Sequence, residues 1–448
     1  MASAAEQLAQ NINFRSFAQA TELKKRIWFT LAALVVYRLG TYIPVPGIDP
    51  VALDRIFQQQ SQGMLGMFDM FSGGSLGRMT IFALSIMPYI SAAIIMQLLT
   101  AVSPTLEQLK KEGETGRKKI NQYTRYGTVG LAAVQAYGIA VGLEGMNAPG
   151  GGSAVIDPGL FFRFVTVITL TGGTIFLMWL GEQITQRGVG NGISLIIFSG
   201  IVANLPSAFA STMELGRTGA LSTGVIIGIL VMAVAVIAFI VFVERAQRRL
   251  IVQYPKRQVG NKMFGGESSH LPIKLNSSGV IPLIFASSLL LMPLTVAGFS
   301  GQGGPDWLTT VTALLGRGQP LYLGLYVSLI VFFAFFYTSI VFNPDDTAEN
   351  LKKNGGFIPG IRPGRNTSNY IHYVLMRLTT VGAIYLALVA ILPEILVARY
   401  NVPFYFGGTS LLIVVSVTMD TVQQVQSYLL AHQYEGLIRK SKLKGRRS

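Results

Sequence analysis

The sequence predicts an all-α polytopic membrane protein with ten transmembrane helices in two inverted-repeat halves. Three observations support this fold class. Half of the 448 residues are hydrophobic and only 13% are charged, whereas soluble domains carry about 25% charged residues. Ten apolar segments approach the roughly 20 residues that cross the hydrocarbon core of a bilayer. The lysines are confined to the N-terminal segment, alternate loops and the C-terminal tail.

The ten apolar segments succeed one another along most of the chain. The fifth is short and rich in glycine, and the seventh holds Pro282 and Pro293. The expected spans are 27–43, 79–100, 124–143, 160–181, 190–208, 221–243, 277–298, 320–342, 374–393 and 403–423.

The cations predict the orientation of these spans. All 14 lysines lie in the terminal segments and alternate loops, and the other loops hold no Lys and a few arginines, among them Arg38 and Arg78. Cytoplasmic loops carry the excess of Lys and Arg. Both termini are therefore expected in the cytoplasm, which requires an even number of spans. Residues 1–26 lack the apolar stretch of a cleavable signal peptide.

Ten spans divide into five plus five. Because five is odd, two similar halves insert with opposite orientations, which is the inverted-repeat architecture of many transport proteins. A short echo fits this division: IMPYI at 86–90 in the second span corresponds to IPLI at 281–284 in the seventh.

The centres of the spans hold almost no ionisable side chains. Ion-coupled carriers and proton pumps usually keep such a residue at depth, so a passive pathway with an apolar constriction fits better. The chain has no Cys and only three scattered histidines, so no metal site is expected. Nucleotide-binding and hydrolase motifs are absent. An inverted-repeat solute carrier and an intramembrane enzyme remain the alternatives.

The stretch from Met67 to Ile90 is an interrupted span. Asp69, the Gly73-Gly74 pair and Arg78 break its apolar run. Residues 64–77 are too short to cross a membrane and are expected to fold back as a re-entrant half-helix, because irregular backbone at depth is tolerated only where it lines a cavity. The second span is expected to start at Met79.

Two basic loops, 244–275 and 343–373, are longer than the topology needs. The first alternates cations with aliphatic residues, a pattern typical of a protruding hairpin or short strands. In the second, prolines and glycines stiffen a turn that is expected to present Ile361 and Arg362 outward. Such loops suit contact with an acidic protein, ribosomal RNA or anionic lipid, and the sequence alone does not separate these.

These motifs closely resemble those of the SecY family of protein-translocation channels. The match runs from IPVPGID (43–49) to the basic tail. The stretches that carry it are MFSGGSLGRMTIFALSIMPYISAAIIMQLL, KKEGETGRKKINQYTRYGT, FLMWLGEQITQRGVGNGIS, VFVERAQRR, VIPLIFASS, FIPGIRPG and PFYFGGTSLLIVVSV.

The resemblance implies a clamshell of two halves, 1–208 and 220–448, joined by an external hinge at 209–219. It implies a lateral gate between the second and seventh spans, and it makes residues 64–77 the plug, with Met67, Phe68, Asp69, Met70, Phe71, Ser72, Gly73 and Gly74 as its central residues. A pore ring is implied at Ile86, Ile90, Ile193, Ile197, Ile284 and Ile413. Gln97, Gln135 and Asn276 are expected near the gate seam, although interhelical hydrogen bonding explains these amides equally well.

The function implied is that of a non-enzymatic channel subunit without cofactors in the bacterial cytoplasmic membrane, which translocates unfolded preproteins and releases membrane segments laterally. The implied partners are SecE and SecG, the SecA ATPase, the ribosome, preproteins with their signal sequences, SecDF with YajC, YidC, and anionic lipids. Motor or ribosome docking is expected at Arg249, Lys256, Arg257, Lys262 and Arg362. Asn261-Lys262 stands where the family often carries an arginine pair, which halves the local charge.

Overall fold

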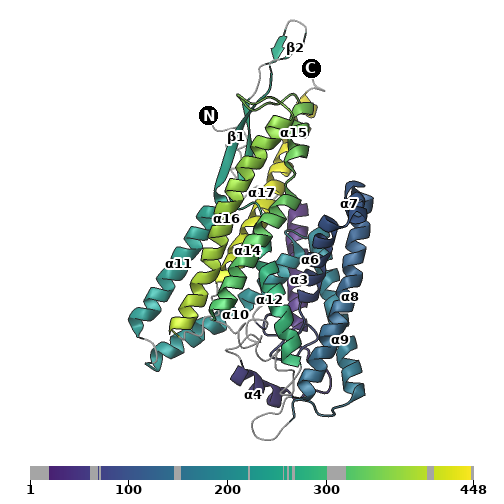
Figure 1. The fold of residues 1–448 in the computed structure, drawn as a ribbon, viewed down its shortest axis with the longest axis vertical. Coiled ribbons are helices and arrows are strands. Elements are labelled where there is room, and N and C mark those ends of the chain that lie inside the picture. The colour runs from purple at the N-terminus through teal and green to yellow at the C-terminus, as the bar shows by residue number, and fades with distance from the viewer. Residues whose placement is uncertain are drawn as a thin grey trace. The chain divides into compact units, whose positions relative to one another are not determined.

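The computed structural model describes residues 20–60, 69, 72–145, 153–219, 222–255, 257–259, 262–264, 268–299, 319–400 and 408–444. Most of these residues are helical (Figure 1). The helices up to residue 217 are α3 (Thr21–Gly40), α4 (Pro50–Gln60), α6 (Met87–Val102), α7 (Pro104–Lys111), α8 (Glu114–Glu144), α9 (Leu160–Arg187) and α10 (Gly192–Arg217). The later helices are α11 (Thr223–Arg245), α12 (Ile281–Phe299), α14 (Pro320–Val341), α15 (Pro344–Lys353), α16 (Arg365–Tyr400) and α17 (Gly408–Lys444).

Each of the ten predicted spans overlaps one helix. The ten helices are α3, α6, α8, α9, α10, α11, α12, α14, α16 and α17. Within the described ranges, six helices are long and apolar enough to cross a membrane, or seven if the bent pair α6–α7 is one span. The membrane-helical fold is thus confirmed, and the structure is consistent with ten spans.

The bend between α6 and α7 follows from a proline. Ser103 is extended and Pro104 opens α7, because the residue before a proline is driven out of the helical region. The two axes differ by 98°. The apolar helix therefore ends at Val102, and the polar α7 leaves in another direction.

The chain divides into two compact units. The described residues of the first unit come from 20–207, 291–299 and 417–444, and those of the second come from 208–290, 319–400 and 408–416. The division passes through α10 at Ser207, directly after Pro206.

In the first unit, α8 and α9 form a long helical hairpin, α6 packs against α8, and α3 packs against α9. Small residues allow close approach of these helices. Ala92 of α6 lies opposite Gly127 of α8, and Ile193 and Ile196 at the start of α10 lie over Gly181 of α9.

In the second unit, a β-hairpin rises from the end of α11. Its strands β1 (Gln247–Gln253) and β4 (Ser268–Lys274) are antiparallel, and β2 (Arg257–Val259) pairs with β3 (Lys262–Phe264) nearer the tip. The predicted hairpin in loop 244–275 is confirmed. A small core joins its base to the next loop and to α16, through Leu250, Ile273, Ile358, Ile371 and Leu375.

Three local predictions are wrong. The second helix begins at Met87 rather than Met79, and residues 73–86 form successive turns. The fifth helix continues to Arg217, beyond the predicted end of its span at 208, and the hinge at 209–219 stays a prediction. Ile361, expected to point outward, packs against the core that contains Ile358, because burying an aliphatic side chain against that core is favourable.

Candidate functional site

The described part of the predicted plug is its C-terminal end. Asp69, Ser72, Gly73 and Gly74 are described, whereas Met67, Phe68, Met70 and Phe71 lie outside the described residues. The Gly74 amide donates to the Asp69 carbonyl (2.9 Å), and Gly73 has a φ of 69°. Asp69 and Ser72 are helical, and this bond with a left-handed glycine after them is a Schellman arrangement.

The Asp69 side chain stabilises the turn that follows. Its Oδ1 accepts from the Gly77 amide at 2.7 Å, and the Ser72 Oγ accepts from the Leu76 amide at 3.2 Å. Residues 72–77 therefore form a compact turn that is hydrogen-bonded to Asp69, and the half-helix itself stays a prediction. The interruption of the sequence at Asp69 and at the glycine pair builds this turn.

Two arginines contact this end and were missed as site residues by sequence reasoning. Arg38 of α3 donates from Nη1 to the Gly73 carbonyl (2.9 Å), and Arg78 donates from Nε to the Gly74 carbonyl (3.0 Å). The available signal was their place among the few arginines outside the lysine-bearing loops.

Residues 79–86 lead from this end to the first ring residues. Met79 and Ser85 have φ values of 45° and 50°, in the left-handed region that costs a non-glycine residue about 1 kcal/mol. The segment is held by backbone pairing, since the Val45 amide donates to the Met79 carbonyl (2.9 Å) and the Ile81 amide to the Ile43 carbonyl (3.0 Å).

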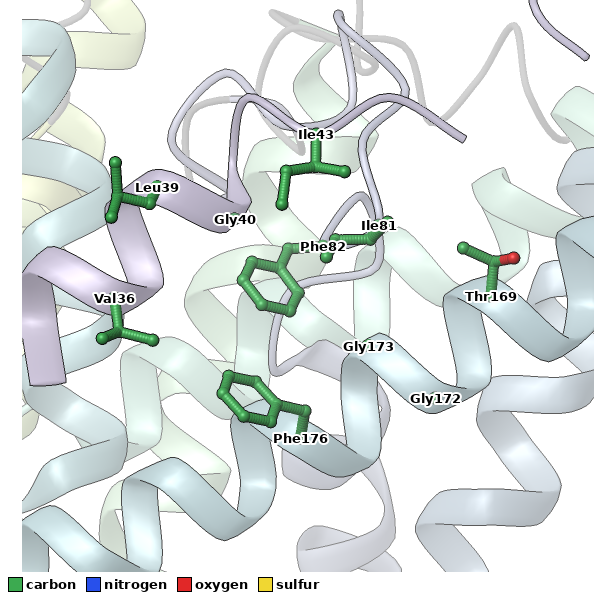
Figure 2. Close-up of a pocket in the computed structure, with 10 residues that line it drawn as sticks. All are labelled: Val36, Leu39, Gly40, Ile43, Ile81, Phe82, Thr169, Gly172, Gly173 and Phe176. Atoms are coloured by element: carbon green, nitrogen blue, oxygen red, sulfur yellow. The ribbon is translucent and has the colours of Figure 1, made fainter. Parts of the chain in front are cut away.

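Phe82 fixes this segment between two helices. Its ring stacks on Phe176 of α9, with centroids 5.8 Å apart, and occupies the space where Gly40 of α3 has no side chain. The Ile81 carbonyl lies against Gly173 of α9, where a Cβ would come within 2.0 Å of that oxygen. Figure 2 shows these residues around an almost entirely apolar cavity of about 500 Å³.

The predicted ring residues all lie near helix ends that the structure describes. Ile86 directly precedes α6, and Ile90 lies in its first turn. Ile193 and Ile197 open α10, Ile284 opens α12, and Ile413 lies in the second turn of α17. All are buried except the half-buried Ile193. The first four belong to one unit and the last two to the other, so the closure of a ring stays a prediction.

The three gate amides differ in their bonding. Gln97 Oε1 and Gln135 Oε1 are buried and accept no hydrogen bond from any described residue. Asn276 Nδ2 instead donates to Glu244 Oε1 (2.8 Å) and to the Gly279 carbonyl (3.1 Å), and its Oδ1 accepts from Ser278. Asn276 therefore anchors the chain that enters α12, and the gate role of all three stays a prediction.

Two of the five docking residues have described side chains. Arg249 is exposed on β1, and Arg362 is exposed on the turn between Gly360 and Gly364. Their neighbours Leu250 and Ile361 pack in the same small core. Arg257 and Lys262 lie on β2 and β3, and Lys256 lies outside the described residues.

The second loop is also rigid at its base. Gln253 at the end of β1 exchanges two backbone hydrogen bonds with Phe357, at 2.9 and 3.0 Å. The Thr367 hydroxyl donates to the Arg362 carbonyl (3.0 Å). The turn that carries Arg362 is thus fastened to the hairpin that carries Arg249. No cluster of three metal-ligating side chains occurs in the described part of the chain.

Comparison with known proteins identifies the family. The family model described as SecY matches residues 80–422. A Protein translocase subunit SecY from Rickettsia conorii is 55% identical over 437 residues, covering 98% of this chain and all of that protein.

Two solved structures share the fold, each covering 91% of this chain and 92% of theirs. One concerns the SecY plug domain, said to stabilise the closed state of the translocation channel and to maintain a membrane seal; it has a TM-score of 0.65 at 20% identity. The other, Sec61 in a canine ribosome-channel complex from the endoplasmic reticulum, has a TM-score of 0.64 at 18% identity. On the family model and the near full-length identity, the chain belongs to the SecY family.

Proposed function

We propose that this chain is the central subunit of the protein-conducting channel that moves unfolded preproteins across the bacterial cytoplasmic membrane and releases apolar segments sideways into the lipid. The observation that carries the proposal is 55% identity to a translocase subunit over 98% of the chain. The spans offer a passive apolar pathway, so an external motor drives transport. The SecA ATPase and the translating ribosome are the motors that fit.

The pore is sealed by the six isoleucines together with the plug. β-Branched side chains are stiff at χ1, and a narrow aliphatic constriction resists ions by dewetting. Aliphatic groups also form no hydrogen bonds, so such a constriction tolerates any peptide. The position of these residues supports this role, because the turns before Met87 end at Ile86 and Ile90 lies in the first turn of α6.

The lateral gate lies between the second and seventh spans, α6 and α12. The amide oxygens of Gln97 and Gln135, which are buried and accept no hydrogen bond from the described residues, support a seam that is only marginally stable when closed. A hydrophobic signal sequence replaces this seam by entering between the helices. The hinge that opens the halves lies at 209–219, and the nearby boundary between the two compact units, within α10 directly after Ser207, supports this position.

The exposed arginines on the two basic loops form the docking surface for SecA or the ribosome, with both termini and these loops in the cytoplasm. A fold shared with Sec61 in a ribosome-channel complex supports the ribosome as a partner. SecE and SecG complete the channel, and SecDF, YajC, YidC and anionic lipids are further partners of this assembly.

Crosslinking of a stalled preprotein tests the channel role. The chain has no Cys, so Ile86→Cys and Ile284→Cys each introduce one defined thiol. After depletion of the native protein, either variant should crosslink to the translocating chain. Phe242→Cys on the exposed face of α11 should not. Normal export after depletion, or equal crosslinking at Phe242→Cys, would refute the proposal.

A charge reversal tests the docking surface. Arg362→Glu should block export while the channel itself still inserts into the membrane, because a guanidinium on a rigid turn makes directional contacts with an acidic partner. Lys352→Glu, also exposed in the same loop region, is the matched control and should export normally. Normal export by Arg362→Glu would remove Arg362 from the docking surface.

A further inference from the structure

The plug end bears an unusual set of contacts for a membrane protein. The Gly73 carbonyl accepts from Arg38 Nη1 at 2.9 Å and from Arg78 Nη2 at 3.5 Å, and the Gly74 carbonyl accepts from Arg78 Nε at 3.0 Å. Both carbonyls directly follow Ser72, which is helical. Two guanidiniums thus converge on one pair of adjacent carbonyls.

Tyr42 holds the two guanidiniums together. The Arg78 Cζ lies 4.3 Å and the Arg38 Cζ 5.3 Å from the centroid of its ring, within the range of a cation–π contact. Arg38 Nη2 also donates to the Tyr42 hydroxyl at 3.3 Å. The ring offsets the repulsion between two like charges, and each guanidinium remains aimed at the plug.

The plug end is also seated closely against its own unit. The Tyr37 hydroxyl of α3 donates to the Ser72 carbonyl (3.4 Å). A Cβ on Gly73 would come within 2.9 Å of the Gly200 Cα of α10. The glycine therefore allows the plug backbone to contact both α3 and α10, and Ser72 is 1% exposed.

We propose that Arg38, Tyr42 and Arg78 form a latch, a set of positioning residues that keeps the plug seated until a preprotein arrives. This inference rests on the proposed function of residues 64–77 as a plug. Among the described residues neither arginine forms an ion pair with a carboxylate. The latch therefore consists of charge-assisted bonds to neutral carbonyls, which hold the plug closed without a direct ion pair.

The first test follows plug opening directly in the cysteine-free chain. Ser72→Cys places a buried thiol on the plug end, and a membrane-impermeant maleimide added from the side proposed as extracytoplasmic reports its exposure. Adding Arg38→Gln should raise the labelling rate about tenfold, since a hydrogen bond to a charged group is worth roughly one to two powers of ten in the closed-to-open ratio. Arg55→Gln, an exposed arginine of α4, is the control and should leave the rate unchanged.

A second variant guards against misfolding. Arg78 is exposed, so Arg78→Gln is expected to fold normally and to raise the rate in the same direction. An unchanged rate in both Arg38→Gln and Arg78→Gln would overturn the latch.

The second test separates the latch from the plug. Variants are reconstituted with their channel partners into vesicles, and ion leakage is measured. Deletion of residues 65–75 should raise leakage more than it lowers export, and Arg38→Gln should leak in the full chain but add nothing in the deletion background. Added leakage there would place the effect of Arg38 elsewhere and overturn the latch. A deletion that does not leak would instead refute the sealing role of the plug, while the labelling result still decides whether the latch holds it.

Discussion

The α8–α9 hairpin and the 72–86 segment belong to one unit but are held by different chemistry. The hairpin carries a guanidinium–carboxylate pair near each end: Arg125 to Glu182 at 2.9 and 2.7 Å, and Arg163 to Glu144 at 2.9 and 2.6 Å. The 72–86 segment is held by arginines on neutral carbonyls, by backbone pairing and by glycine contacts.

Under the proposed plug role, this difference distinguishes a scaffold from a movable part. Arg125 contacts both carboxylate oxygens of Glu182, and both Arg163 donors share Glu144 Oε2. Such charge-assisted pairs restrict distance and orientation, so we interpret α8 and α9 as a rigid frame. The 72–86 segment contains two strained residues, Met79 and Ser85, and strain persists only where the surroundings impose it. The proposed plug must leave its closed position and return to it. Hydrogen bonds to neutral carbonyls suit such a segment better than ion pairs do.

Gly173→Ala should have the largest effect on this comparison, because it dislodges the movable segment from the frame. The added Cβ meets the Ile81 carbonyl oxygen at 2.0 Å, and such overpacking costs about 1–3 kcal/mol. Gly172→Ala is the matched control, since a Cβ there meets nothing within 4 Å. We expect a lower Tm and more ion leakage for Gly173→Ala alone. Equal Tm and equal ion leakage in the two variants would contradict the close contact between Ile81 and Gly173 of α9.

Glu182→Gln should have a smaller effect, because it weakens the frame without touching the movable segment. Its partner Arg125 is 47% exposed and Glu182 is 25% exposed, so solvent screening limits the loss to about 0.5–1 kcal/mol. Tm should fall slightly while ion leakage stays unchanged. Glu107→Gln, which removes a more exposed pair with Lys111 in α7, is the control and should not change Tm. Leakage in Glu182→Gln would show that the frame and the plug are coupled.

The helices and the basic hairpin could be predicted because their signals are local. Long apolar runs predicted a helix for every span. Alternating cations and aliphatic residues predicted a hairpin or short strands in loop 244–275, where β1 and β4 form. The motifs of the sequence also predicted membership of the SecY channel family, and this prediction is confirmed.

The turns of residues 73–86 could not be predicted, since they depend on partners distant in sequence. Ile43, Val45 and Gly173 supply those contacts, and no local pattern marks them. The latch could not be predicted for the same reason. In the sequence, Arg38 and Arg78 stand out only because they lie outside the loops that hold the lysines. The inward position of Ile361 likewise depends on a core built by β1, β4 and α16.

Ser85→Gly should have the smallest effect and the opposite sign. Relief of the left-handed φ of 50° should raise the free energy of unfolding by about 1 kcal/mol. The greater conformational freedom of glycine in the unfolded chain should lower it by roughly 0.5–1 kcal/mol. The net stabilisation is therefore about a few tenths of a kcal/mol. Ser91→Gly is the control, because Ser91 lies inside α6 with helical geometry and has no such strain to release. We expect Tm to rise slightly for Ser85→Gly and to fall for Ser91→Gly.

The pair of serine variants also tests whether the strain serves the movable segment. The strain at Ser85 would help the plug leave if it is present only in the closed conformation. Ser85→Gly then stabilises the closed conformation relative to the open one. The maleimide should therefore label the Ser72→Cys thiol more slowly when Ser85→Gly is added. Faster labelling, or a fall in Tm equal to that of Ser91→Gly, would mean that the turn is part of the frame. The boundary between frame and movable segment would then lie before Ser85 rather than at Ile86.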